Sequence, residues 1–276
     1  MVSQEQRRRQ LAREKFLRQQ QRRTQARRKA NVRNSVIASV LGVIVIGSVT
    51  LYTTGALKGD DKKANAAADV TPSATPPSKA PDPCGKPAAG SVEKMSWKKE
   101  PAMTIDTSAK YSMKLATTCG DIDVALKTAA APHTVNSFNF LAGKGYFDHT
   151  KCHRLTTTGI YVLQCGDPQG TGMGGPGYTL PDENLKDKSL KGNTYPAGTV
   201  AMANTGQKHT GGSQFFLVYK DSPLPPSYTP FGTVSEAGMK VLQKIAAAGA
   251  QAADPTSGNT APNATVVINK ATVTKS

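Results

Sequence analysis

The pattern of apolar and polar positions changes near Met103. Beyond this point apolar side chains recur at every second residue in two short runs, one through Met113 and Leu115 and one over residues 122–126. Such alternation is typical of strands with one buried face. Gly120-Asp121 lies between the two runs and has the composition of a turn. The chain is therefore expected to enter a β-rich domain here.

Two helices and a last strand are predicted further along the chain. One helix is expected from Pro132, which suits a first turn, to Ala142, with glycines behind it. The second is expected over Ser235–Ala248, and the strand over Thr265–Thr272. Apolar residues three or four positions apart mark the buried helix faces: Val135, Phe138 and Leu141, then Met239, Leu242, Ile245 and Ala246. Many short strands with two isolated helices predict a closed or nearly closed β-barrel with helices over its openings.

Residues 35–57 form an uncharged run of 23 residues dominated by small and aliphatic side chains. A helix rises 1.5 Å per residue, so this length crosses a hydrocarbon core of about 30 Å. The alternative is a cleaved signal peptide. However, the run exceeds the usual apolar region of about 7–15 residues, and no clear A-x-A site follows Leu57 directly. We therefore expect a single, uncleaved transmembrane helix.

The basic charge is concentrated in the first residues. Residues 1–33 carry 12 Lys and Arg and two Glu, a net charge of +10 out of +16, which leaves +6 for the rest. This distribution argues against a nucleic-acid partner. The positive-inside rule predicts a cytoplasmic tail over 1–34 and an extracytoplasmic domain, in a single-pass protein of the cell membrane. The tail is expected to fix topology and touch anionic lipid headgroups. An RNA- or protein-binding arm is the alternative.

Residues 58–102 have the composition of a disordered linker rich in Pro, Ala, Lys and Ser, which leaves residues 103–276 as the folded domain. An even number of cysteines in an exported domain permits disulfides. The sequence does not choose among the three possible pairings of Cys84, Cys119, Cys152 and Cys165. Cys152 and Cys165 flank a predicted hairpin and could lie near each other. Alternatively, these cysteines are unpaired and pack as small buried apolar side chains.

Three other patterns suggest chemistry and are set aside. Residues 170–175 fit G-x-G-x-x-G, but Pro176-Gly177 follows and no helical pattern begins, so a glycine loop is expected and no cofactor. Ser213 lacks the G-x-S-x-G elbow because Phe215 stands at its second glycine. No metal is expected, because paired ligand spacing is missing from the residues with suitable identities: His149, Cys152, His153 and Cys165.

Arg154 is the most informative candidate residue. An arginine within an apolar hairpin must find acceptors or reach a cleft, and a salt bridge to a carboxylate is the structural alternative to a functional role. Gln164 lies ten residues further on, across the same hairpin. Apolar walls could come from Tyr161, Val162 and Phe216, and a strand edge from Ala203 and Asn204. Three neighbouring residues are expected to be plain core: Met202, Phe215 and Leu217.

Four motifs occur in a fixed order: His153-Arg154-Leu155, Gln164-Cys165-Gly166-Asp167, Met202-Ala203-Asn204 and Gly212-Ser213-Gln214-Phe215-Phe216. Over roughly residues 104–276 this order and spacing resemble the cyclophilin family of peptidyl-prolyl isomerases, whose core reads F-H-R-[IV], Q-x-G-D, M-A-N and G-S-Q-F-F. The resemblance implies a mainly β fold, a closed antiparallel eight-stranded β-barrel capped by two helices. It also implies a catalytic role for Arg154 and Gln164. The implied substrate-binding residues are Tyr161, Val162, Ala203, Asn204, Gln214, Phe216, Leu224 and Tyr228.

The chain departs from the family pattern at several positions. Its hairpin is about two residues longer, at 156–160, and Tyr161, Val162 and Tyr228 stand for a usual Phe, Met and His. Many eukaryotic members carry a Trp near the position of Pro223-Leu224, where it supports cyclosporin binding. The single Trp of this chain is Trp97, outside the predicted domain. The resemblance therefore implies weak inhibition by cyclosporin.

The function expected from these features is prolyl isomerisation that assists the folding of exported proteins, by a monomer without a cofactor. Its partners would be proline-containing polypeptides and the membrane, through residues 35–57. A non-catalytic proline-peptide-binding module or holdase on the same fold is the alternative. Arg154 separates the two, because binding alone would not require it.

Overall fold

The computed structural model describes residues 81–254 and 258–276, which belong to one compact unit, Thr75–Ser276. The predicted tail, the predicted membrane span over 35–57 and most of the predicted linker lie outside the described residues. No helix within 81–254 and 258–276 is long and apolar enough to cross a membrane.

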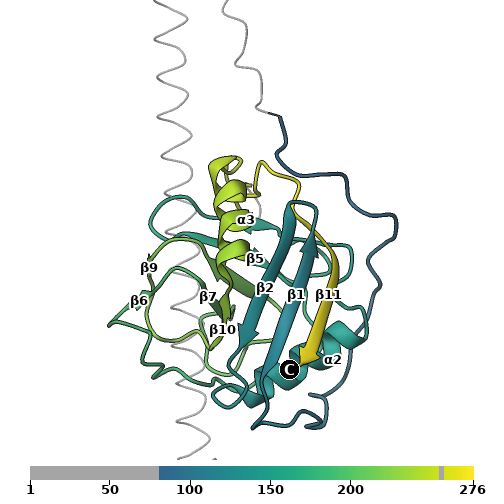
Figure 1. Ribbon diagram of the computed structural model, residues 1–276, viewed down its shortest axis with the longest axis vertical. Helices are drawn as coiled ribbons and strands as arrows, with labels where there is room; N and C mark the ends of the chain where they lie inside the picture. The colour runs from purple at the N-terminus through teal and green to yellow at the C-terminus, as the bar shows by residue number, and fades with distance from the viewer. Residues whose placement is uncertain (1–80, 255–257) are drawn as a thin grey trace, which may run out of the picture. The chain divides into compact units, whose positions relative to one another are not determined.

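The main element of the fold is a curled antiparallel sheet in the order β3-β11-β1-β2-β10-β7-β8-β5-β4 (Figure 1). Its strands are β1 (Tyr111–Thr117), β2 (Gly120–Leu126), β3 (Thr150–Lys151), β4 (Arg154–Leu155), β5 (Val162–Cys165), β7 (Thr199–Met202), β8 (Phe215–Val218), β10 (Pro230–Val234) and β11 (Val267–Lys275). A separate pair is formed by β6 (Thr194–Tyr195) and β9 (Ser222–Pro223). The turn predicted at Gly120-Asp121 is displaced by two residues: Thr118 and Cys119 form the tight β1–β2 turn, and Gly120 and Asp121 begin β2, with Thr117 opposite Gly120.

Both predicted helices are present, as α2 (Pro132–Gly143) and α3 (Glu236–Ala247). Ser235 caps α3, because its hydroxyl accepts a hydrogen bond from the Gly238 amide at 3.1 Å. Gly238 is also where α3 meets the sheet, since a Cβ there would lie 2.7 Å from Val234 and 3.2 Å from Ile122. Figure 1 shows α3 lying along β2, while α2 lies near β1 and β11.

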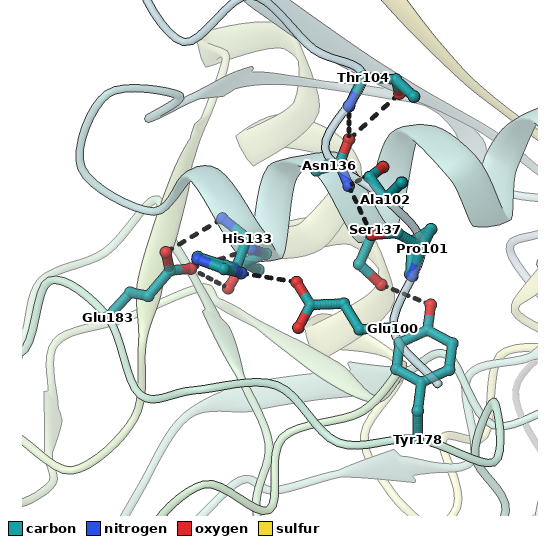
Figure 2. Close-up of polar contacts among 10 residues, drawn as sticks. Glu100, Pro101, Ala102, Thr104, His133, Asn136, Ser137, Tyr178 and Glu183 are labelled. Atoms are coloured by element: carbon teal, nitrogen blue, oxygen red, sulfur yellow. Dashed lines mark hydrogen bonds and ion pairs between the residues drawn. The ribbon is translucent and has the colours of Figure 1, made fainter. Parts of the chain in front are cut away.

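Helix α2 is capped by a residue distant in the sequence. Its N-cap, Ala131, has no side-chain acceptor. Instead the Glu183 carboxylate accepts from the amides of His133 at 3.0 Å and Thr134 at 2.9 Å, and from the Thr134 hydroxyl (Figure 2). A carboxylate here satisfies donors that the first turn cannot pair internally and complements the helix dipole. The cap therefore fixes the segment around Glu183 against α2.

The predicted closed eight-stranded barrel is wrong in strand number and in closure. The described residues form nine strands in one sheet, and its edge strands β3 and β4 are not paired with each other. The reason lies at the outer edge of β4, the edge that does not pair with β5. There the Leu155 amide donates to the Thr260 carbonyl at 2.8 Å. The Thr260 hydroxyl in turn donates to the Leu155 carbonyl at 2.6 Å. The loop before β11 thus occupies the edge that a closing strand would need.

Residues 81–104 form what we call the N-terminal strap, a segment that lies against the domain. Cys84 forms a disulfide with Cys119, and the Trp97 amide donates to the Pro176 carbonyl at 2.8 Å. The Trp97 ring packs edge-on against Phe140, with ring centroids 5.1 Å apart. Residues 81–102 were expected to belong to a disordered linker, but in the structure they are attached to the domain. Single anchoring residues hold this segment in place despite its linker-like composition.

The second half of the strap is tied to α2 through one buried amide (Figure 2). The Asn136 side chain donates to the carbonyls of Pro101, at 3.3 Å, and Ala102, at 3.0 Å, and its oxygen accepts from the Thr104 amide at 2.9 Å. Beside it, Glu100 accepts a hydrogen bond from His133 Nδ1 at 2.6 Å. Three consecutive carbonyl and carboxylate groups of the strap are thus fixed by one face of the helix.

Candidate active site

One row of side chains crosses four neighbouring strands and combines the candidate polar and apolar residues. In the register of β4, β5, β8 and β7, Arg154 lies opposite Gln164, Gln164 opposite Phe216, and Phe216 opposite Ala201. Partners in register point to the same face of a sheet. The next row, which runs through Leu155, Leu163, Leu217 and Val200, belongs to the main core. Alternation along the strands therefore places the candidate row on the face opposite the main core.

The polar part of this row is a chain of amide hydrogen bonds. Arg154 Nη1 donates to Gln164 Oε1 at 3.2 Å, and Gln164 Nε2 donates to Gln214 Oε1 at 2.9 Å. Gln214 Nε2 then donates to the Gly174 carbonyl at 2.9 Å. Each amide is oriented by its neighbour, so Arg154 is held by a network that reaches as far as the glycine loop.

Arg154 keeps most of its hydrogen-bonding capacity unused. The side chain is half-buried, and within the described part of the chain its guanidinium bonds only to Gln164 and pairs with no carboxylate. An arginine carries five N–H donors. The alternative of a salt bridge is thus not realised among these residues. A half-buried cation with free donors can interact with a group that enters from solvent.

The apolar part of the row belongs to a second cluster, separate from the main core. Its buried members are Val162, Tyr195, Ala201, Phe216 and Val218. Further residues pack against them while staying partly exposed: Ile160, Leu190, Ala203, Leu224 and Tyr228. Partial exposure is what distinguishes a wall that can receive an apolar ligand from a closed core. Four predicted binding residues, Val162, Phe216, Leu224 and Tyr228, therefore meet here, and Ala203 lies at the edge.

Tyr195 organises this cluster and was missed by the sequence analysis. Its hydroxyl donates to the Tyr228 carbonyl at 2.7 Å and accepts from the Tyr228 amide at 3.1 Å. Burial raises the pKa of Tyr195 to about 12, so the hydroxyl stays protonated. The Phe216 ring lies edge-on to Tyr228, with centroids 5.5 Å apart. The only signal for Tyr195 was an isolated aromatic residue in a polar loop.

Tyr161 lies outside this apolar cluster. Its ring packs against Tyr219, with centroids 5.9 Å apart, and beneath the ammonium of Lys220, at 4.5 Å. The preceding residue, Ile160, packs on the cluster instead. The hairpin is longer here than the family pattern, and the sequence alignment alone could not decide which of the two residues would face the pocket.

A groove of about 960 Å³ adjoins the row on the side of Gln164 and Gln214. Ala203 and Asn204 form part of its lining. The Asn204 amide is oriented by a 2.8 Å hydrogen bond to the Ser227 carbonyl and a 2.9 Å bond from the Gly206 amide. Every predicted site residue except Tyr161 thus lies either in the polar row, in the apolar cluster or along this groove.

The glycine run at 170–175 is confirmed as a loop, and it wraps around the buried carboxylate of Asp167. Amides of Gln169, Thr171 and Gly172 donate to that carboxylate at 2.6–2.9 Å. Burial alone would raise the pKa of Asp167, but these backbone donors together hold it below its usual value. The loop therefore has a fixed shape at the groove wall.

His153 lies beside Arg154 in the sequence and is 6% exposed. Both ring nitrogens are buried without a hydrogen-bond partner among the described residues. Burial lowers the pKa of His153, Asp167 partly opposes this shift and the charge of Arg154 adds to it. His153 is therefore neutral at pH 7.

Met202, Phe215 and Leu217 are buried in the main core, as predicted.

Cys152 and Cys165 form a disulfide. Joined sulfurs cannot act as thiolate ligands. Across 81–254 and 258–276, no three His, Cys, Asp or Glu side chains are arranged to hold a metal ion. The site therefore consists of one guanidinium, a chain of amides and an apolar wall.

A family profile described as "Cyclophilin type peptidyl-prolyl cis-trans isomerase/CLD" matches residues 112–273. The chain therefore belongs to the cyclophilin-type peptidyl-prolyl cis-trans isomerase family.

Two curated bacterial relatives illustrate the extent of the similarity. "Probable peptidyl-prolyl cis-trans isomerase B" of Mycobacterium leprae is 50% identical over 149 residues, which are 51% of this chain and 50% of the relative. "Peptidyl-prolyl cis-trans isomerase B" of Bacillus subtilis is 44% identical over 115 residues, 41% of this chain and 76% of the relative. The chain thus spans about half the length of the mycobacterial relative. A solved cyclophilin-type isomerase of Cryptosporidium parvum is 26% identical and covers 60% of this chain and 99% of its own, with a TM-score of 0.48.

Proposed function

We propose that the chain is a peptidyl-prolyl cis-trans isomerase in which Arg154 stabilises the twisted prolyl amide. One observation carries the proposal: a half-buried guanidinium with free donors lies in register with Phe216 of the apolar cluster, with only β5 between their strands. Gln164 holds the guanidinium by the 3.2 Å hydrogen bond. The cluster around Phe216 would receive the proline ring.

The physical problem is the barrier to rotation about the X–Pro bond, about 18–20 kcal/mol, which makes the uncatalysed step take roughly 10–100 s. When the bond is twisted, amide resonance is lost and the prolyl nitrogen gains a usable lone pair. Arg154 can donate to that nitrogen only in the twisted state. An interaction that exists only in the transition state lowers the barrier, and no proton needs to be transferred.

The apolar cluster and the groove have complementary tasks in this mechanism. Phe216, Val162 and Leu224 hold the proline ring while the acyl part rotates. The groove beside Gln164 and Gln214 accepts the residues that flank the proline. Tyr195 keeps the wall in place through its two hydrogen bonds to Tyr228. Because the wall is fixed before substrate binds, less ordering entropy is lost on binding.

The test is catalysis of Xaa-Pro isomerisation in a tetrapeptide by the full-length protein, followed by exchange NMR or a coupled protease. Acceleration well above the uncatalysed rate is the expected result. Binding of the peptide without acceleration would instead identify a non-catalytic proline-peptide module or holdase, the alternative. The free donors of Arg154 favour catalysis, because binding a proline ring does not require them.

We further propose that the domain acts outside the cytoplasm on exported polypeptides, tethered as a monomer by residues 35–57. The uncharged run and the basic tail before it support this topology. So do the two disulfides, which persist in oxidising compartments. Protease added to intact cells should remove the domain and leave the tail protected. Recovery of the whole protein in the soluble cytoplasm would refute the proposal.

A further inference from the structure

The groove next to the polar row has an uneven distribution of charge. Its lining consists of backbone, glycines and uncharged side chains, with three exceptions: Lys98, Lys99 and Glu100. All three belong to the N-terminal strap, which precedes the residues matched by the family profile, 112–273. The charge of the groove is thus supplied by a segment outside the matched part of the chain.

Glu100 does not neutralise the two lysines, because its carboxylate is engaged elsewhere. Oε1 of Glu100 accepts from His133 Nδ1 at 2.6 Å, and Figure 2 shows the side chain directed toward α2. The pairing with Glu100 raises the pKa of His133, which favours the protonated ring and its positive charge. In contrast, the ammonium groups of Lys98 and Lys99 have no hydrogen-bond or ion-pair partner within the described residues, and both side chains are exposed.

The backbone that carries the two lysines is fixed on both sides. Before them, Trp97 is bonded to Pro176 and packed on Phe140. After them, Asn136 binds the carbonyls of Pro101 and Ala102. The approach of the strap is close, since a Cβ at Gly177, whose φ is +90°, would meet the backbone of Trp97 at 2.6 Å. Lys98 and Lys99 are therefore held at the groove wall.

We propose that Lys98 and Lys99 make this isomerase select proline peptides that carry an acidic side chain beside the proline. The proposal rests on the proposed function and refines its substrate class. The groove shares Gln164, Ala203 and Gln214 with the candidate active site. A peptide whose proline occupies the apolar cluster would place a neighbouring side chain in the groove, where a carboxylate meets two unpaired ammonium groups.

The experiment uses peptides with a central Ala-Pro pair and varies four positions, the two residues before the pair and the two residues after it. Glu, Lys or Ala is placed at each of these positions in turn. We expect kcat/KM for the Glu peptide to exceed that for the Lys peptide roughly three- to tenfold at one of these positions, as suits exposed ion pairs. The preference should shrink between low salt and about 0.5 M salt, because exposed charges are screened. The fluorescence of Trp97, the single Trp of the chain, reports whether the strap stays in place.

The variant K98A/K99A should bring the Glu-to-Lys ratio close to one, and K98E/K99E should invert it. The matched control K86A/K94A removes two exposed strap lysines that do not line this groove and should leave the ratio unchanged. Equal kcat/KM for Glu and Lys peptides at all four positions would overturn the proposal. Vesicles of phosphatidylglycerol that bind the protein through Lys98 and Lys99, with no peptide preference, would assign the pair to a lipid surface. A protein that accelerates none of the peptides would instead disprove the proposed isomerase function.

Discussion

Arg154 on β4 lies directly opposite Gln164 on β5, and a 3.2 Å hydrogen bond joins Nη1 of the arginine to Oε1 of the glutamine. Gln164 is itself held by Gln214. The guanidinium is thus positioned before any substrate arrives, and the two side chains should act as a unit in catalysis.

The first prediction concerns this pair. Arg154→Ala should lower kcat/KM by about 10²–10³, the loss typical of one preorganised donor. Gln164→Ala should cost less, because it removes only the residue that orients the guanidinium. In a double-mutant cycle the two effects should be non-additive by about 0.5–3 kcal/mol. Strictly additive losses in folded variants, measured by the tetrapeptide assay, would show that Gln164 does not act through Arg154.

A second prediction concerns cyclosporin. An indole offers a broad apolar face and an N–H donor, and neither Pro223 nor Leu224 offers both. The only indole, Trp97, packs on Phe140 in the strap. We expect weak inhibition alongside intact isomerase activity. Pro223 is exposed, so P223W has room and should tighten the drug by at least about tenfold. Nanomolar inhibition of the unmodified protein would contradict the assignment of this loop.

A third prediction concerns the Cys84–Cys119 disulfide, which spans 35 residues. Loop closure of this length stabilises the folded state by roughly 3–4 kcal/mol in the chain-entropy model. The C84S/C119S variant should lose about this much in urea unfolding. Its Trp97 emission should change at lower urea than its far-ultraviolet circular dichroism, because the strap can then detach first. Coincident transitions would mean that the strap and the sheet unfold together even without the covalent link.

A fourth prediction concerns pH and His153. Burial lowers its pKa in the folded state, so below about pH 6.5, the ordinary His value, the unfolded chain binds more protons than the folded one. The free energy of unfolding should therefore fall as pH drops below 6.5. His133, whose pKa is raised by Glu100, acts in the opposite direction. The useful quantity is therefore the difference between the unmodified protein and H153L, measured by urea unfolding from pH 7.5 to 5. An unchanged pH slope in H153L would exclude His153 as the cause.

Local signals predicted the elements well. Pro132 and the glycines behind it marked α2 to within one residue, and Ser235 marked the start of α3. These signals act over a few residues, so the sequence displays them directly. The candidate row was also predictable, because alternation alone separates Phe216 from the core residues Phe215 and Leu217.

Long-range pairings could not be predicted in the same way. The edge of β4 is closed by Thr260, 105 residues from Leu155, and no local pattern indicates such a contact. The strap has the composition of a linker, yet Cys84 and Trp97 attach it at single points. Tyr195 supports the apolar cluster from an otherwise polar loop. In each case the deciding interaction joins residues that the sequence keeps far apart.

The position of Cys119 determines how the domain would respond to a mechanical load. A force that pulls on the chain before Cys84 enters the domain through the Cys84–Cys119 link, at the turn between β1 and β2. The part of the strap that follows Cys84, which includes Trp97, Lys98 and Lys99, lies outside this load path. Reduction of the link would redirect the same force along the strap and peel it from Pro176 and α2. With the link oxidised, the chain before Cys84 could thus be pulled while the groove wall stays unloaded.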